Sequence, residues 1–411
     1  MKILYINHYA GSPENGMDFR PYYLAKEWKK IGHKVTIVGA SYSHLRVKQP
    51  KIKKQFDKEI IGEITYFWIK TPPYKSSGLK RILNMLTFIA KLFKYRKKII
   101  KYVNPEVVIA SSTYPLDIYP AFYIAKKNHA KLFFELHDMW PLSPMIIGGY
   151  SKYHPFIWII QKAENFACKK CDYYVSMLSN TKDYLQKHGL DPNKFVFVPN
   201  GFSSDEKNVF AEPIPEEYQI LLKKLKNERK LIVGYAGGHA PSNALKSLLV
   251  AAKELKGNNN ISFVLVGSGP QKNELIKFSL NNKLKNVFFL GPIPKVSIPN
   301  LLSYFDILYA GGVSSVLHKY GTSSNKIVDY MLARKPIIFS VDEPNSLVET
   351  VGCGIQISAE DEVEIRKAIK YISELSQEER TAMGEKGHEY AIKELNYTSL
   401  AKKFIGVIDQ S

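Results

Sequence analysis

The chain lacks most of the features that mark secreted or membrane-spanning proteins. It has only three cysteines in 411 residues, and an odd number cannot pair completely into disulfides. Its best apolar stretch, residues 82–93, contains Lys91 and is shorter than the roughly 18 to 20 residues that a spanning helix needs. The apolar start, residues 1–6, is shorter than the core of a signal peptide. We therefore expect a cytoplasmic protein with reduced cysteines.

Two of the cysteines, Cys168 and Cys171, have the CxxC spacing of redox and zinc sites. A zinc site of that kind needs a second ligand pair, which the sequence lacks. A thioredoxin-type pair follows a strand, whereas this pair lies in a helical stretch. A redox or metal role is therefore a minor alternative, and we expect no metal site.

Acidic residues are scarce relative to basic ones, at 38 against 58, which gives a net charge of +20. Residues 41–104 hold 16 Lys and Arg against three Asp and Glu, and so carry most of the excess. A surface of that charge density attracts acidic lipid headgroups, nucleic acids or phosphorylated substrates.

The rest of the composition is that of a globular protein, with 45% hydrophobic residues and length for two or three domains. Short β-branched runs alternate with helical periodicities, the pattern of parallel α/β sheets. We predict two doubly wound domains, residues 1–205 and 206–395, and a C-terminal helix at 396–411 that can pack back on the first domain. The predicted strands are 3–6, 35–38, 64–68, 107–110, 132–135, 173–177 and 195–198, then 231–235, 261–266, 287–290, 307–309, 337–339 and 354–357.

Ligands of such open sheets bind beyond the carboxyl ends of the strands. Two domains facing each other would form a cleft with one ligand in each half. The organisation therefore predicts a two-substrate enzyme.

The first predicted strand leads into a glycine-containing loop, residues 11–17, and a helix from about residue 18 to 31. A loop of this kind can present N–H groups to an anion, although the spacing of dinucleotide-binding loops is absent. Asn15 and Gly16 are thus candidates for an acceptor or phosphate loop, with a plain connector as an equal alternative. Arg20, one turn into the helix, either reaches the cleft or lies on the helix surface without a role in binding.

His137 and Asp138 follow the predicted strand 132–135, at the end of a central strand where catalytic groups are expected. A histidine at this position is either catalytic or structural, and the position favours catalysis.

Two glycine turns follow successive strands of the second domain. Gly237 and Gly238 precede Asn243 and a predicted helix, and Gly267 and Gly269 repeat the arrangement one unit later. Glycine lets the backbone approach a diphosphate, and a helix N-terminus supplies positive charge. Together the two turns favour a nucleotide diphosphate.

Asn325 begins another predicted helix, in which Lys326 and Asp329 lie three residues apart on one face. This spacing pairs a phosphate-binding cation with a carboxylate suited to ribose hydroxyls. The alternative is a surface ion pair.

The predicted helix at residues 79–102 interleaves apolar side chains with eight Lys and Arg residues. Such a segment suits an anionic membrane surface. The alternative is a core helix with a solvated basic face.

These motifs, in this order, resemble those of retaining glycosyltransferases of family four, and they span almost the whole chain. The residues that carry the resemblance are Asn15-Gly16-Met17 with Arg20, His137-Asp138-Met139-Trp140-Pro141, Val198-Pro199-Asn200-Gly201, Val266-Gly267-Ser268-Gly269-Pro270, Leu290-Gly291, Asn325-Lys326-Ile327-Val328-Asp329-Tyr330-Met331 with Lys335-Pro336, and Gly352-Cys353-Gly354.

The resemblance implies a GT-B fold, two facing Rossmann-like domains with a cleft between them. It implies a nucleotide-sugar donor, usually a UDP-sugar, in the second domain and an acceptor, often lipid-linked, in the first. It also implies transfer with retention, with no metal or other cofactor. The pattern looks most like the branch that builds O-antigen and capsule polysaccharide, including transferases of acetamido sugars. We therefore expect a hexosyl- or acetamidohexosyltransferase that lies at the inner face of the membrane as a peripheral protein.

One departure concerns the acidic pair of the family, two Glu residues eight positions apart. Here Gly321 stands at the first position and Asp329 at the second. Asp329 can still hold a ribose, but any role of the first acid must come from elsewhere. The basic residues that many members place after strand 231–235 are not obvious either, which puts more weight on Lys326 for the diphosphate.

Two other functions fit parts of the pattern. A non-hydrolysing UDP-sugar epimerase would use the same donor cleft without an acceptor. A nucleic-acid-binding protein would explain the charge, but the sequence contains no recognised binding module, so we expect no nucleic-acid partner.

Overall fold

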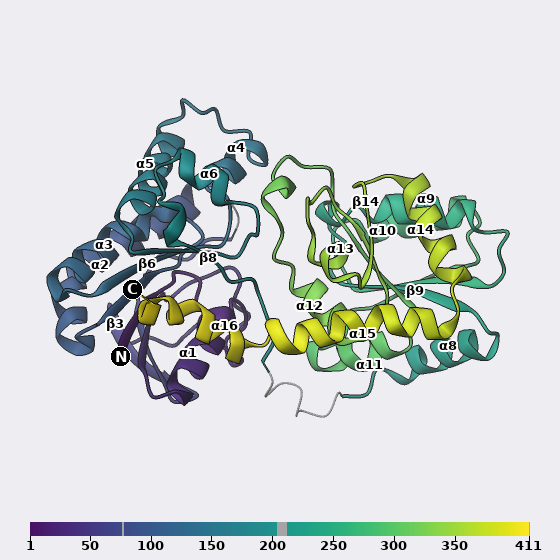
Figure 1. Cartoon of the computed structure of the whole chain (residues 1–411), viewed down its shortest axis with the longest axis horizontal. Coiled ribbons are helices and arrows are strands. Elements are labelled where there is room, and N and C mark those ends of the chain that lie inside the picture. The colour runs from purple at the N-terminus through teal and green to yellow at the C-terminus, as the bar shows by residue number, and fades with distance from the viewer. Residues whose placement is uncertain (76–77, 204–211, 411) are drawn as a thin grey trace. The chain divides into compact units, whose positions relative to one another are not determined.

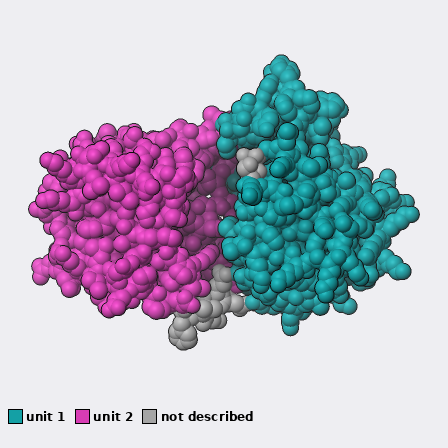
Figure 2. All heavy atoms as spheres, turned by 180° about the vertical axis from the view of Figure 1, so that it is seen from behind, with its two compact units in different colours: residues 1–199, 397–411 teal, residues 200–396 magenta. Residues whose placement is uncertain are grey.

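The computed structural model describes residues 1–75, 78–203 and 212–410, which form two compact units (Figures 1 and 2). Unit 1 comprises residues 1–199 and 397–411, and unit 2 comprises residues 200–396. The predicted boundary between residues 205 and 206 lies outside the described residues. Both units are doubly wound α/β domains, so the predicted fold class is confirmed.

Unit 1 is built on an eight-stranded sheet with the order β3-β4-β2-β1-β5-β6-β7-β8. All neighbours are parallel except β3 and β4, which form an antiparallel pair at one edge. The strands are β1 (Lys2–Ile6), β2 (Lys34–Ala40), β3 (Phe56–Ile61), β4 (Ile64–Ile69), β5 (Val107–Ala110), β6 (Lys131–Leu136), β7 (Tyr173–Ser176) and β8 (Phe195–Phe197).

The sequence prediction missed β3. Its residues alternate in burial, and several are charged, so it lacks the apolar run that marks the other strands. It pairs only with β4, through a two-residue turn at Gly62 and Glu63 that takes positive φ angles. An edge hairpin with an exposed face needs no continuous apolar sequence.

The helices of unit 1 cover the sheet, and all but the last lie in the connections between its strands. They are α1 (Arg20–Lys30), α2 (Leu79–Val103), α3 (Ile118–Asn128), α4 (Leu142–Ile146), α5 (Pro155–Lys170), α6 (Lys182–Lys187) and α16 (Tyr397–Ile405). The predicted first helix therefore starts at Arg20 rather than near residue 18.

The last helix, α16, packs against α1 within unit 1 (Figure 1). Trp28 Nε1 donates a hydrogen bond to the Ala401 carbonyl at 2.9 Å, and the rings of Tyr23 and Tyr397 stack at 5.2 Å. Phe404 adds an edge contact to Trp28. These contacts make the end of the chain a structural part of unit 1.

Unit 2 contains a six-stranded parallel sheet with the order β11-β10-β9-β12-β13-β14. Its strands are β9 (Leu231–Ala236), β10 (Ile261–Val266), β11 (Val287–Leu290), β12 (Ile307–Gly311), β13 (Ile337–Ser340) and β14 (Gly354–Ile357). Its helices are α8 (Glu216–Asn227), α9 (Leu245–Glu254), α10 (Lys272–Asn281), α11 (Ile298–Ser303), α12 (Asn325–Leu332), α13 (Leu347–Val351), α14 (Glu362–Glu374) and α15 (Gln377–Glu394).

Both sheets reverse their winding beside the first strand of the unit. In unit 1 this switch lies between β1 and β5, and in unit 2 it lies between β9 and β12. Ligands of doubly wound sheets bind at such a switch, beyond the carboxyl ends of the strands. The loops after β1 and β5, and those after β9 and β12, are therefore the places to search for function.

No helix in the described part of the chain is both long and apolar enough to cross a bilayer.

Candidate functional site

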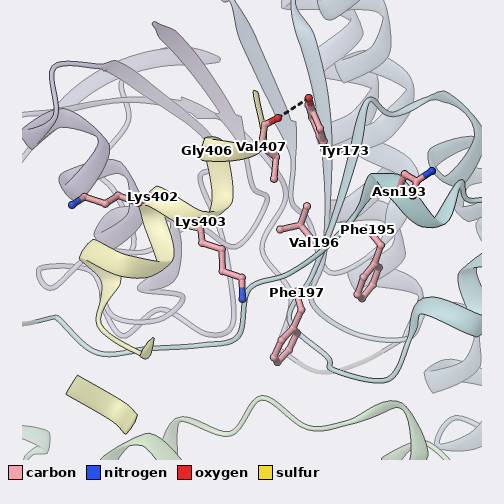
Figure 3. A pocket seen from close by; sticks show the side chains of 9 residues that line it. All are labelled: Tyr173, Asn193, Phe195, Val196, Phe197, Lys402, Lys403, Gly406 and Val407. Atoms are coloured by element: carbon pink, nitrogen blue, oxygen red, sulfur yellow. Dashed lines mark hydrogen bonds between the residues drawn. The ribbon is translucent and has the colours of Figure 1, made fainter. Parts of the chain in front are cut away.

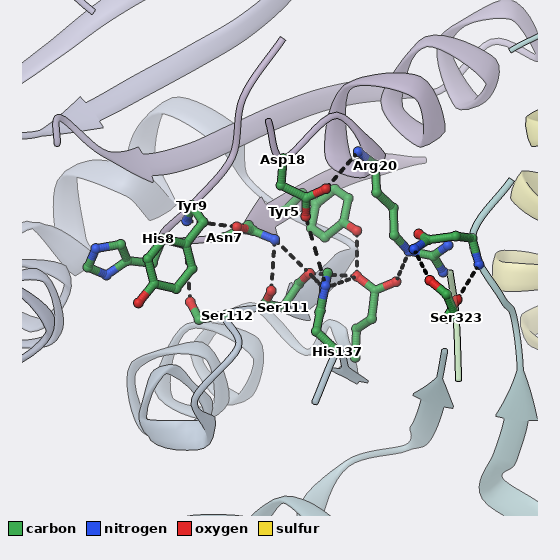
Figure 4. A network of polar contacts seen from close by, with 12 residues as sticks. Tyr5, Asn7, His8, Tyr9, Asp18, Arg20, Ser111, Ser112, His137 and Ser323 are labelled. Carbon is green, nitrogen blue, oxygen red and sulfur yellow. Dashed lines mark hydrogen bonds and ion pairs between the residues drawn. The ribbon is translucent and has the colours of Figure 1, made fainter. Parts of the chain in front are cut away.

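The switch region of unit 1 contains a buried ion pair between Arg20 and Glu135 (Figure 4). Arg20 Nε donates to Glu135 Oε1 at 2.8 Å, and the two side chains are only 1% and 0% exposed. The other guanidinium nitrogens donate to the backbone carbonyls of Val198 and Pro199. Arg20 therefore lies inside unit 1 with partners on every nitrogen, instead of extending from the loop of Asn15 and Gly16.

Glu135 is the centre of a larger network. Its Oε2 accepts hydrogen bonds from Tyr5 and Ser111, each at 2.5 Å. Burial alone would raise the pKa of Glu135, but the charge of Arg20 and the hydrogen bonds outweigh burial and hold that pKa well below its usual range. A carboxylate at the end of β6 is thus fixed in its charged form.

His137 contacts this carboxylate directly. Its Nε2 lies 2.8 Å from Ser111 Oγ and 3.3 Å from Glu135 Oε2. Because the single hydroxyl proton of Ser111 goes to Glu135, its oxygen accepts the bond from His137 Nε2–H. The other ring nitrogen, Nδ1, lies 3.9 Å from Asp18 Oδ2, beyond hydrogen-bond distance.

The charge of His137 follows from the same contacts. Burial would lower the pKa of His137, but the negative charge of Glu135 and its hydrogen bond more than compensate, so the pKa is raised. The side chain keeps 11% of its surface exposed. His137 is thus a positioned, easily protonated imidazole at the carboxyl end of a central strand, with Nδ1 available to a ligand.

Asp138 occupies a different position. Its Oδ1 accepts bonds from the Met139 N–H at 2.8 Å and from Ser143 Oγ at 2.6 Å. It therefore shapes the loop that leads into α4, and no bond joins it to His137 in the described residues. The predicted pair is adjacent in sequence, but only His137 belongs to the Glu135 network.

Asn15 and Gly16 hold the first loop against the segment after β2. Asn15 Oδ1 accepts from Ser12 Oγ at 2.7 Å, and its carbonyl accepts from the Val47 N–H at 2.9 Å. Gly16 has a φ of +99°, and a Cβ there would lie 2.9 Å from the Val47 nitrogen. Both residues thus have internal roles in connecting two loops.

The glycine turns of unit 2 pack tightly together. A Cβ on Gly267 would lie 1.9 Å from the Gly237 carbonyl oxygen, and one on Gly269 would lie 2.5 Å from the His239 carbonyl oxygen. Only glycine fits at these two positions. With Gly238, the turns line a cavity of about 210 Å³ that Pro292, Ile293 and Ile298 complete.

Lys326 reaches this region from the first turn of α12. Its Nζ donates to Tyr235 Oη at 3.0 Å and to Asn243 Oδ1 at 3.2 Å, and it lies 4.2 Å from the Tyr235 ring centre. A Cβ on Gly237 would lie 3.3 Å from Nζ. The structure therefore brings Lys326 to Asn243 and the first glycine turn, although Asn243 lies 83 positions away in sequence.

The ammonium of Lys326 has no carboxylate partner among the described residues. Burial lowers its pKa to about 8 because no negative charge offsets the lost hydration. An anion beside Nζ would remove that penalty. The exposed Asn325 begins α12, and the half-buried Asp329 lies three residues after Lys326 on the same helix.

Several residues of these regions were not found from sequence. In unit 1 they are Glu135, Tyr5 and Ser111, which surround His137. In unit 2, Glu343 is 4% exposed and accepts a 2.6 Å hydrogen bond from Thr322 Oγ1. Burial raises the pKa of Glu343. A carboxylate from the loop after β13 thus contacts Thr322, next to Gly321, the position at which this sequence lacks the first acid of the family pattern.

A cavity of about 610 Å³ lies elsewhere in unit 1 (Figure 3). It lies between the edge strand β8 and α16, and Tyr173 Oη donates to the Val407 carbonyl on its wall. None of the predicted site residues lines it. It lies outside the switch region, so we do not assign it to the candidate site.

The sequence matches two family models. Residues 15–206 match Glycosyltransferase Family 4, and residues 219–390 match Glycosyl transferases group 1, so the two models together cover most of the chain. The chain belongs to the glycosyltransferases. No curated protein matches it. Because both models describe glycosyltransferases, the epimerase and nucleic-acid alternatives are not favoured.

Solved structures resemble this glycosyltransferase along its whole length. HepE of Anabaena, in complex with UDP-glucose, is 14% identical with a TM-score of 0.65, and both chains are covered in full. A trehalose-6-phosphate protein of E. coli, bound with UDP-2-fluoro glucose, is 11% identical with a TM-score of 0.72, covering 100% of this chain and 99% of that one. WaaG, a glycosyltransferase involved in lipopolysaccharide biosynthesis, is 14% identical with a TM-score of 0.64 and full coverage of both. At these identities the likeness establishes the GT-B fold.

Proposed function

We propose that the chain transfers a sugar from a nucleotide-diphosphate sugar, a UDP-sugar, to an acceptor bound by unit 1. The uncompensated ammonium of Lys326 beside the glycine turns carries this proposal, because a diphosphate supplies the missing negative charge. UDP or UDP-sugar complexes of structural relatives, such as HepE, support the same donor.

The transfer breaks the bond between the sugar and the diphosphate and forms a bond to an acceptor oxygen. Lys326 and the N–H groups of the Gly237 and Gly267 turns stabilise the charge of the leaving diphosphate. Asp329 accepts from the ribose hydroxyls, and His137 orients the sugar or the acceptor through Nδ1. The leaving phosphate takes the acceptor proton, so the configuration is retained and no metal or other cofactor is needed.

The acceptor in this proposal is a lipid-linked glycan of cell-surface polysaccharide synthesis, such as O-antigen or capsule. WaaG, a structural relative, is involved in lipopolysaccharide biosynthesis. The basic surface of unit 1 fits an enzyme that works at an anionic membrane.

Replacing Lys326 with Ala is expected to weaken UDP binding about 10- to 150-fold, because a charge-assisted bond is worth about 1.5 to 3 kcal/mol. Asp329→Ala should show a loss in the same range if it holds the ribose. Isothermal titration calorimetry with UDP measures both, and Lys367→Ala, an exposed lysine on α14, is the matched control. Folded variants with wild-type affinity would show that this group is not the donor site.

Helix α2 provides the second test of the proposal. Phe88, Leu92 and Ile99 are buried, whereas the leucines at positions 79, 83 and 86 form an exposed stripe one or two turns apart. Basic side chains near an anionic surface contribute about 1 kcal/mol each, and salt screens them. An apolar stripe beside basic residues is the pattern of a helix that lies on a membrane.

We therefore expect the protein to sediment with acidic but not with neutral vesicles, less so at high salt. Changing four basic residues of α2 to Gln should abolish most of this binding while transfer to a water-soluble acceptor analogue persists. These residues are Lys94, Arg96, Lys97 and Lys98. The matched control removes four charges from exposed lysines of unit 2, namely Lys223, Lys224, Lys367 and Lys370. Equal recovery with the two kinds of vesicle would leave the basic stretch as a solvated face.

A further inference from the structure

A second group of basic side chains lies at the carboxyl ends of β1 and β2 in unit 1, separate from the Glu135 network. It consists of Arg46 and His44 from the loop after β2 and Arg81 from the first turn of α2. Among the described residues, neither arginine forms an ion pair with an Asp or Glu. Both arginines come from the basic segment 41–104, but they differ from its exposed lysines because they are partly or fully buried.

Arg46 is the deepest member, at 5% exposure. Its Nη2 donates to the Ala40 carbonyl at 2.5 Å, and the guanidinium lies 4.9 Å from the Trp68 ring centre. Its Nε and Nη1 are buried and have no partner in the described structure. Buried donors are nearly always satisfied, so two unsatisfied N–H groups on one guanidinium point to a missing acceptor.

Tyr9 connects the other members of the group. Arg81 Nη2 donates to Tyr9 Oη at 3.3 Å, and the Tyr9 ring contacts the His44 ring edge-on at 5.8 Å. His44 Nδ1 lies 2.8 Å from Tyr74 Oη. Arg81 Nε is a third buried donor with no partner in the part of the chain that the structure describes. The group therefore combines positive charge with phenolic hydroxyls and unused donors.

His8 lies beside Tyr9 in the loop after β1 (Figure 4). The basic side chains around it affect its pKa. Burial lowers its pKa first, and the charges of Arg46, Arg81 and His44 lower it further. Arg46 comes from the loop after β2 and Arg81 from α2, and the His8 ring lies 4.5 Å from the Tyr9 ring over which Arg81 sits at 5.7 Å. Its Nδ1 is bonded to Tyr114 Oη at 2.5 Å, so His8 is held as a neutral side chain of the wall.

We propose that Arg46, Arg81 and His44 form an anion site that binds a phosphate or diphosphate group of the acceptor. A guanidinium presents paired N–H groups that match phosphate oxygens, and tyrosine hydroxyls complete such a site. The position, beyond the carboxyl ends of β1 and β2, is where doubly wound sheets bind ligands. Arg46 lies between two exposed loop residues, Leu45 and Val47. The assignment to the acceptor rests on the proposed function, but the anion site itself does not.

Calorimetric titration of the full chain with inorganic pyrophosphate, in the presence of saturating UDP, tests the site. We expect Arg46→Gln and Arg81→Gln each to weaken pyrophosphate binding about tenfold or more, the usual effect of losing a charge-assisted bond. Arg46→Lys should lose less, since it keeps the charge. The matched control is Arg229→Gln, at an exposed arginine of unit 2.

Two further measurements complete the test. One distinguishes the possible sources of the anion, and the other shows which of the two proposals has failed. Glucose 1-phosphate carries its phosphate without a lipid, and a short prenyl diphosphate carries its phosphates on a lipid. The compound whose binding is weakened more by Arg81→Gln identifies the acceptor class. Pyrophosphate binding that persists in Lys326→Ala but falls in Arg46→Gln identifies the site in unit 1, so a wrong donor site would not affect this result. The proposal is overturned if pyrophosphate does not bind, or if both Gln variants, shown to be folded by thermal melting, bind it like wild type.

Discussion

Replacing His137 with Ala is expected to reduce glycosyl transfer about 10- to 150-fold, the usual effect of losing a charge-assisted hydrogen bond to the reacting sugar or acceptor. UDP binding should stay nearly unchanged, because His137 lies in unit 1 and the UDP-binding residues that we propose lie in unit 2. Its Nε2 is fixed by Ser111 and Glu135, which leaves Nδ1 to act on the sugar or the acceptor.

The raised pKa of His137 determines how stability and transfer change with pH. The folded pKa of His137 is raised above the free value of 6.5, so the folded state holds its proton at a pH where an unfolded chain has lost it. This contribution to stability is complete below about pH 6.5 and disappears as the pH rises through the folded pKa. Transfer that needs the protonated imidazole should fall over that same range.

Steady-state transfer between pH 6 and 9, together with UDP titration, measures these effects. Ser111→Ala removes a hydrogen bond from the imidazole and from Glu135 without removing a charge, so it should shift the pH midpoint while transfer persists. His129→Asn, at an exposed histidine after α3, is the matched control and should behave like wild type. Full transfer by His137→Ala would make His137 a structural residue of the β6 end.

The fold followed from local patterns along the chain. Thirteen of the strands have continuous apolar or β-branched runs, and each was predicted within a few residues of its observed bounds. The capping box of Ser376 and Glu379 at the start of α15 is likewise a local feature, because its two hydrogen bonds depend only on residues three apart. Strand β3 escaped prediction because its pairing with β4, and not its own composition, makes it a strand.

The candidate sites were less predictable, because each depends on residues that the fold brings together. The cluster of Lys326 with Tyr235 and Asn243 joins residues up to 91 positions apart. Glu135 gave one signal, a single acid at the end of an apolar strand, but its partner Arg20 lies 115 positions away. Sequence spacing showed which residue types were present, whereas only tertiary contacts showed which charges were already paired.

Arg20 illustrates the difference most clearly, since it was predicted to belong to an acceptor or phosphate loop. Removing it leaves Glu135 as a buried and uncompensated carboxylate, and breaking a buried pair in this way costs about 3 to 5 kcal/mol. Arg20→Met should therefore destabilise unit 1 by an amount in this range. A ligand-binding arginine would instead lose affinity with little change in stability.

The sequence provides a selective probe for that experiment. All four tryptophans, at positions 28, 68, 140 and 158, belong to unit 1, so their fluorescence during denaturation follows this unit alone. The matched control is Lys29→Met, on the same helix as Arg20. This change breaks the exposed 2.8 Å pair between Lys29 and Glu63. Solvent already screens that pair, so its loss should change the transition little. Equal transitions for Arg20→Met and wild type would mean that the buried pair adds nothing to folding, and Arg20 would return to the set of candidate ligand residues.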